Sequence, residues 1–114
     1  MSQPTAISLV SAKQRIAEIG FDFPTPAAPI AAYVPTRRVG DQIYVSGQIP
    51  IRHGKLIAEG IVPTDVTLER AVECAQLCIL NALAAAYAAL EEDEGIAQIV
   101  RIGCFVACTP GFVD

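Results

Sequence analysis

Residue types that build common catalytic and metal sites are scarce in this sequence. Among its 114 residues there is no tryptophan, one methionine and one histidine, and only 18% are charged. A zinc centre is disfavoured because the sequence has neither a second histidine nor a Cys-x-x-Cys pair. His53 has no nearby cysteine, serine or carboxylate that would complete a proton relay, so we expect it in a solvated turn. We therefore predict no metal and no cofactor.

Basic residues are also few. Eight Lys and Arg stand against twelve Asp and Glu, which gives a net charge of −4. Nucleic-acid affinity depends on Lys and Arg that neutralise phosphates, so nucleic acid is not an expected partner. Residues 1–7 lack a basic segment followed by an apolar run, and the apolar stretch 77–90 is short and contains Asn81. We expect a cytoplasmic protein that makes no membrane contact.

The four cysteines form two pairs, each with a spacing of four residues. Cys74 and Cys78 lie in one apolar segment, and Cys104 and Cys108 lie in another. In a reducing compartment such residues are most simply buried small hydrophobes. We therefore predict no disulfide framework.

With 53% hydrophobic residues, the chain is large enough for one core and too small for two, so we predict a single domain over 1–114. Its lead, residues 1–27, contains a short helix over 12–19 with Ser11 as N-cap. A proline-rich extended segment over 22–35 begins in this lead and continues into the family core over 28–114. Tyr33 lies in that segment, and from the residues alone it is either a packing aromatic or a binding residue.

Two extended runs around Gly40-Asp41 predict a tight hairpin. The second run continues into Tyr44-Val45-Ser46-Gly47-Gln48-Ile49-Pro50, where Gly47 breaks the strand and Pro50 stops it. This end presents a hydroxyl at Ser46, an unobstructed backbone at Gly47 and a carboxamide at Gln48, which suits a small polar ligand. The alternative is a strand-terminating turn without a ligand.

Helical periodicity predicts a long helix over 64–92 with Thr67 as the N-cap. Because the helix is apolar on most faces, we expect a sheet on one side and a neighbouring subunit on another. The acidic run 91–94 is most simply a solvated exit. Residues 98–107 form a nearly continuous apolar run that predicts an internal strand, with Gly103 permitting a close backbone approach.

The predicted order of strands, long helix and strand indicates an α+β fold with a helix on one sheet face. The assembled motifs resemble the RidA/YjgF/UK114 family, also called endoribonuclease L-PSP. The resemblance covers about residues 28–112. It rests on Tyr33, Gly40 in the hairpin turn, Ser-Gly-Gln-Ile-Pro at 46–50, the alanine-rich helix, Phe105-Val106 and Phe112.

The resemblance implies a chorismate-mutase-like fold, with a mixed β-sheet and helices packed on one face. It also implies homotrimers with clefts between subunits, and hydrolysis of reactive enamines or imines of amino-acid metabolism to 2-keto acids and ammonia. Carried over by position, Tyr33, Ser46 and Gly47 would line the cleft and Gln48 would support the turn. A noncatalytic keto-acid-binding module remains an alternative, and an endoribonuclease or translation inhibitor is a further one that the acidic composition opposes.

Two features of the sequence depart from the family pattern. Residues 108–111 replace a region where the family often carries an asparagine. The family's later arginine and glutamate, its second helix and its closing strands would all fall beyond Asp114, so we expect 28–114 to be the N-terminal part of the family core in a longer reading frame.

Overall fold

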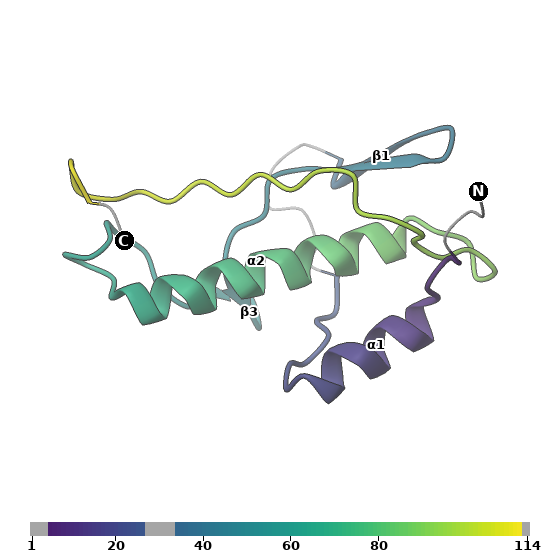
Figure 1. Cartoon of the computed structure of the whole chain (residues 1–114), viewed down its shortest axis with the longest axis horizontal. Coiled ribbons are helices and arrows are strands. Elements are labelled where there is room, and N and C mark those ends of the chain that lie inside the picture. Colours follow the sequence, from purple (N-terminus) through teal and green to yellow (C-terminus); the bar gives the residue numbers. More distant parts are fainter. Residues whose placement is uncertain (1–4, 27–33, 113–114) are drawn as a thin grey trace.

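The computed structural model describes residues 5–26 and 34–112, as an elongated α+β molecule (Figure 1). Helix α1 spans Leu9–Glu18 and helix α2 spans Leu68–Ala88. Between them lie four short strands, β1 (Thr36–Val39), β2 (Gln42–Val45), β3 (Ile51–Arg52) and β4 (Lys55–Leu56). The predicted α+β class is confirmed.

The strands form two separate antiparallel hairpins. β1 pairs with β2 from Thr36 opposite Val45 to Val39 opposite Gln42, around the predicted Gly40-Asp41 turn, where Gly40 has φ 59°. β3 pairs with β4 around the exposed His53, so its expected place in a turn is confirmed. In the described residues these hairpins do not join into the single mixed sheet implied by the resemblance.

Helix α2 is the central element, and it contacts β2 and β3. Thr67 caps it as predicted, because its side chain accepts a hydrogen bond from the Arg70 N–H at 3.1 Å. The helix is shorter than the predicted 64–92, because residues 63–65 form a turn before the cap at Thr67. Its buried side chains are Leu77, Leu80, Ala84, Ala86 and Tyr87.

By length and composition alone, the 21-residue helix α2 could also cross a membrane. Core helices of water-soluble proteins meet the same criteria. The expectation that the protein makes no membrane contact stays a prediction.

Helix α1 begins earlier than predicted. Ser8, not Ser11, is its N-cap, and the Ser8 hydroxyl accepts from the Ser11 N–H at 3.2 Å. Both serines precede residues that favour a helix, and capping at Ser8 makes the helix about one turn longer than capping at Ser11 would. The helix is held to the end of α2 because the Tyr87 hydroxyl donates to the Ile7 carbonyl at 2.8 Å.

The expected internal strand over 98–107 does not form. The segment is extended and runs alongside α2, but it joins no ladder among the described residues (Figure 1). Phe105 is 98% exposed, and Gly103 has no close backbone neighbour, since an added Cβ would meet only the Phe105 ring at 3.7 Å. Cys104 and Cys108 are exposed, contrary to the prediction that they are buried. An apolar run becomes a strand only where another strand pairs with it.

Candidate functional site

Ser46 lies directly after β2, and both of its hydrogen-bond donors bond to the residues that lead into β1. Its N–H donates to the Pro35 carbonyl at 2.9 Å, and its hydroxyl donates to the Val34 carbonyl at 2.7 Å. The serine thus fixes the residue that follows Tyr33. Tyr33 itself lies outside the described residues. In this arrangement the Ser46 oxygen retains lone pairs, so it can accept a hydrogen bond from a ligand while its proton is engaged.

Gly47 is exposed, and its backbone is unobstructed by the described residues, as predicted, while its role in binding stays a prediction. No heavy atom lies within 4 Å of the position that a Cβ would occupy, so the chain itself makes no close approach there. The absence of a side chain leaves the backbone of the turn open to a ligand or to another chain.

The side chain of Gln48 bonds back to Ser46. Its side-chain Nε2 donates to the Ser46 carbonyl at 2.9 Å, and the residue is half-buried. The carboxamide is therefore oriented by a bond to the residue two positions before it. Residues 46–48, here called the Ser46–Gln48 turn, thus carry two hydrogen-bonded polar side chains on either side of an open backbone position.

Two side chains of α2 hold the segment that follows this turn. Asn81 Nδ2 donates to the carbonyls of Ile49 at 3.3 Å and Ile51 at 3.0 Å. Arg70 donates to the Ile57 carbonyl at 2.9 Å. This role of Asn81 was not predicted. Its signal was present, because Asn81 is a polar residue within the otherwise apolar run 77–90.

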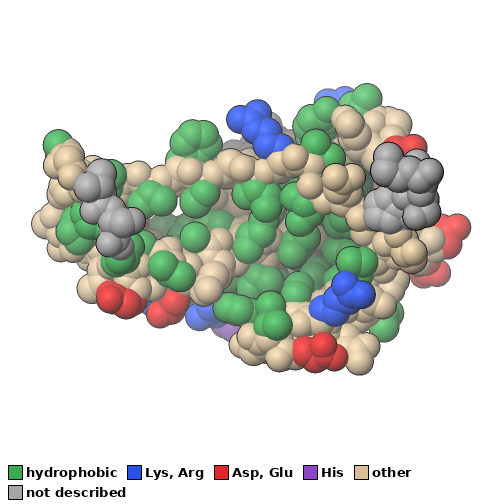
Figure 2. All heavy atoms as spheres, in the orientation of Figure 1, with side chains coloured by type: hydrophobic (Ala, Val, Ile, Leu, Met, Phe, Trp, Pro, Cys, Tyr) green, Lys and Arg blue, Asp and Glu red, His purple; other side chains and the backbone are tan. Residues whose placement is uncertain are grey.

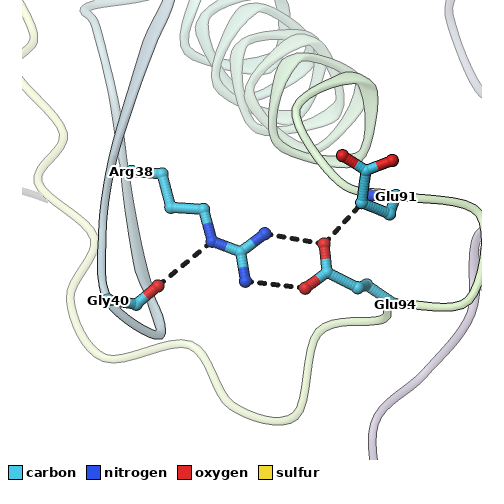
Figure 3. Close-up of polar contacts among 4 residues, drawn as sticks. All are labelled: Arg38, Gly40, Glu91 and Glu94. Atoms are coloured by element: carbon cyan, nitrogen blue, oxygen red, sulfur yellow. Dashed lines mark hydrogen bonds and ion pairs between the residues drawn. The ribbon is translucent and has the colours of Figure 1, made fainter.

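Arg38 of β1 and Glu94, beyond α2, form a two-pronged ion pair (Figure 3). Both nitrogen–oxygen distances are 2.6 Å, and Arg38 Nε also donates to the Gly40 carbonyl at 3.1 Å. The pair lowers the pKa of Glu94 to about 2, chiefly through the Arg38 hydrogen bond, and raises the pKa of Arg38. The acidic run 91–94 is therefore not simply a solvated exit, since Glu94 ties the end of α2 to the first hairpin.

Arg101 is a second arginine whose charge could bind a carboxylate. It is exposed on the extended residues 98–107 and forms no ion pair with the part of the chain that the structure describes. Arg101 is distant from Ser46–Gln48 in the sequence, and no hydrogen bond joins it to them. Within residues 5–26 and 34–112, no group of three or more His, Cys, Asp or Glu side chains is arranged to hold a metal ion.

A cavity of about 200 Å³ lies between α1, α2 and the proline-rich lead. The Phe23 ring packs edge-on against Tyr87 with centroids 6.2 Å apart, and Lys13 Nζ lies 5.9 Å from the Phe23 centroid. Ser46, Gly47 and Gln48 do not line this cavity. The residues that line the cavity are Leu9, Lys13, Phe23, Pro24, Thr25, Pro26, Ala84, Tyr87 and Ala88.

Comparisons with known proteins agree with the motifs and the fold. A family profile described as YjgF/chorismate mutase-like, putative endoribonuclease, matches residues 13–111. The chain is 28% identical over 96 residues to Protein TCP17 of Trypanosoma cruzi, which covers 84% of this chain and 60% of that protein.

Two solved structures are also similar. The protein Atu1372 of Agrobacterium tumefaciens, described as having unknown function, shares 38% identity with a TM-score of 0.71, over 89% of this chain and 60% of its own. A putative endoribonuclease from Shewanella oneidensis shares 34% identity with a TM-score of 0.62, over 67% of this chain and 50% of its own. The chain thus spans 50–60% of the length of these relatives. Its sequence match, its α+β elements and its Ser-Gly-Gln turn together show that it belongs to the YjgF/chorismate-mutase-like family.

Proposed function

We propose that this protein takes part in the hydrolytic deamination of small reactive enamines or imines to 2-keto acids and ammonia. The observation that supports the proposal is the turn at Ser46, Gly47 and Gln48. It holds an oriented hydroxyl oxygen, an open backbone and an oriented carboxamide within three residues. Such a rigid polar turn suits a small planar substrate.

This reaction requires few groups from the protein. The carbon of a protonated imine is already electrophilic, so water adds to it, the carbon–nitrogen bond breaks, and a keto acid and ammonia result. Catalysis then consists of holding the substrate carboxylate, placing the water and protonating the departing amine. Ser46 would accept a hydrogen bond from the substrate nitrogen or the water, and the Gly47 backbone would permit a flat substrate to lie close.

The remaining groups would come from outside the turn. We propose that the protein assembles as a homotrimer whose clefts lie between subunits, with Tyr33 contributing to the cleft beside Ser46. The hydrogen bond from Ser46 to Val34 supports this placement, because it brings the neighbour of Tyr33 to the turn. A cation that binds the carboxylate is also required, and Arg38 is a poor candidate since Glu94 already occupies it.

A noncatalytic keto-acid-binding role is the second candidate. It is favoured by the engagement of the Ser46 proton with the Val34 carbonyl, which leaves the hydroxyl as an acceptor and not as a proton donor to a leaving amine. A turn of this kind can bind a polar ligand without advancing its hydrolysis. The net charge of −4 gives no comparable support to RNA as a substrate.

The test is ammonia release from freshly generated 2-iminobutanoate, measured against a buffer blank and against two variants. Ser46→Ala and Tyr33→Phe are expected to slow release and weaken binding of 2-oxobutanoate. His53→Ala, in the exposed turn between β3 and β4, is the matched control and should leave both unchanged. Binding of 2-oxobutanoate without accelerated ammonia release would favour the second candidate. Neither binding nor release from folded protein would contradict both.

A further inference from the structure

The cavity between α1, α2 and residues 23–26 exists because α2 carries small side chains where these parts meet. Ala84 and Ala88 lie one turn apart on α2, and both line the cavity. Residues four positions apart share one face of a helix, and a methyl group on that face leaves space that a larger side chain would fill. The resulting volume is about 200 Å³, whereas an apolar cavity of about 150 Å³ binds benzene. The cavity therefore has room for one aromatic ring with a short polar group.

Contacts between described residues hold the walls of this cavity in place. The Tyr87 hydroxyl donates to the carbonyl of Ile7, shortly before α1, and the Phe23 ring, which follows α1, packs edge-on against Tyr87. Figure 1 shows α1 running beside the second half of α2. Tyr87 is thus joined to the chain on both sides of α1, so residues of this chain set the positions of the walls.

One cation lies in an otherwise uncharged lining. Lys13 is the only charged residue among the described residues that line the cavity, and it forms no ion pair with any of them or with the nearby Asp22. Its Nζ lies 5.9 Å from the centroid of the Phe23 ring. Burial raises the pKa of Tyr87 and the charge of Arg15 opposes this rise, so a second cation acts on the same region. Figure 2 shows a basic side chain beside the hydrophobic side chains where α1 faces α2. The cavity therefore combines apolar walls with positive charge.

We propose that this cavity binds a small carboxylate that carries an aromatic ring. The ring lies against Phe23 and Tyr87, because aromatic side chains favour edge-on or offset contacts with a further ring. The carboxylate pairs with Lys13 through a charge-assisted hydrogen bond, which is stronger beside apolar walls than in water. A single lysine in the lining matches one negative charge, which favours a carboxylate over a phosphate group.

This site is separate from that of the proposed function. None of Ser46, Gly47 and Gln48 lines the cavity, and the hydroxyl of Ser46 bonds to Val34, which does not line it either. Binding in the cavity also requires no hydrolysis. Each of the two proposals can therefore fail while the other holds.

The experiment is a titration of the 114-residue chain with phenylacetate, followed by the backbone amide signals in NMR spectra. We expect saturable shifts at the amides of Lys13, Thr25 and Ala84, which come from the three parts of the lining. Acetate lacks the ring and benzyl alcohol lacks the charge. Each should bind at least about threefold more weakly than phenylacetate, because each makes only part of the proposed contacts.

Variants then locate the ligand. Ala88→Leu places a larger side chain in the cavity from an exposed helix position, so it should abolish the shifts with little effect on folding. Lys13→Gln keeps a long polar side chain and should weaken binding by roughly three- to tenfold. Lys55→Gln removes an exposed lysine from β4 and is the matched control, with unchanged binding. Ser46→Ala should also leave phenylacetate binding unchanged, which separates this site from the Ser46–Gln48 turn.

Three outcomes would overturn the proposal. One is the absence of saturable shifts up to the solubility limit of phenylacetate. Another is saturable binding that Ala88→Leu leaves intact or that Ser46→Ala removes, since either would place the ligand elsewhere. The third is equal affinity of wild type and Lys13→Gln, or of phenylacetate and benzyl alcohol, which would show that the cavity accepts any ring and that the lysine has no role.

Discussion

Residues 46–48 and residues 97–106 are both extended, and they differ in what surrounds them. At the turn, backbone and side-chain groups are bonded to the chain before β1, and Asn81 of α2 holds the residues that follow. Along residues 97–106 the apolar content is higher, yet no ladder forms among the described residues. Local sequence therefore favours an extended conformation in both places, while order at the turn comes from partners supplied by other elements.

The largest expected contrast comes from removing one large apolar side chain from each environment. Leu80→Ala removes a side chain only 8% exposed on α2 and should lower the free energy of unfolding by about 2–4 kcal/mol. Phe105→Ala removes a larger side chain from residues 97–106 and should change the free energy of unfolding by less than about 0.5 kcal/mol in dilute protein, because the ring is already in water. Urea denaturation at low concentration measures both. A cost above about 2 kcal/mol for Phe105→Ala in dilute monomer would mean that the ring is buried, contrary to the structure.

Two glycines give the next contrast. A Cβ at Gly95 would lie 2.5 Å from the Ile7 carbonyl oxygen, so Gly95→Ala should break the bridge between Ile7 and Ile96 and cost about 1–3 kcal/mol. Gly47→Ala is the matched control, because a Cβ there meets nothing within 4 Å. The midpoint of thermal unfolding should fall for the first variant and stay nearly constant for the second. The reverse order would contradict the assignment of the close backbone approach to Gly95.

A smaller effect is expected at Asn81. Asn81→Ala leaves the carbonyls of Ile49 and Ile51 without their side-chain donor and should cost about 1–2 kcal/mol. Gln76→Ala, at an exposed position of the same helix, should be close to neutral. Because Asn81 positions the residues after Gln48, the same variant should weaken binding of 2-oxobutanoate. Unchanged stability would show that water hydrogen-bonds the carbonyls of Ile49 and Ile51 as well as the Asn81 amide does.

The features that the sequence predicted correctly are local. The Gly40-Asp41 hairpin, the Thr67 cap and the exposed turn at His53 each depend on residues a few positions apart. The family resemblance supplied the fold class, which the YjgF family match confirms. The structure also shows hydrogen bonds that orient the side chains of Ser46 and Gln48, while the role of residues 46–48 in binding stays a prediction.

The features that sequence reasoning missed depend on distant partners or on competition between neighbours. Arg38 and Glu94 are 56 positions apart, and no periodicity links them. Ser8 and Ser11 are both plausible caps, and the choice depends on how far the helix can extend toward the Ile7 contact. The strand expected at 98–107 needed a partner that its own residues could not specify.

The smallest expected effect is the pH dependence of the Arg38–Glu94 pair, which ties the first hairpin to the end of α2. The pKa of Glu94 falls from an ordinary 4.5 to about 2 in the folded chain, so the pair stabilises the fold fully above pH 4.5. That stabilisation is lost as the pH falls through the folded-state pKa near 2. Both side chains of the pair are partly exposed to solvent, so the effect should be small and should shrink further in high salt. Urea midpoints between pH 6 and pH 2 should therefore fall less steeply for Glu94→Gln than for the wild type, whereas Glu92→Gln, one of the exposed neighbours in the same acidic run, should follow the wild type. Identical slopes for all three proteins would show that the ion pair contributes nothing, and that the hairpin is held to α2 by its apolar contacts alone.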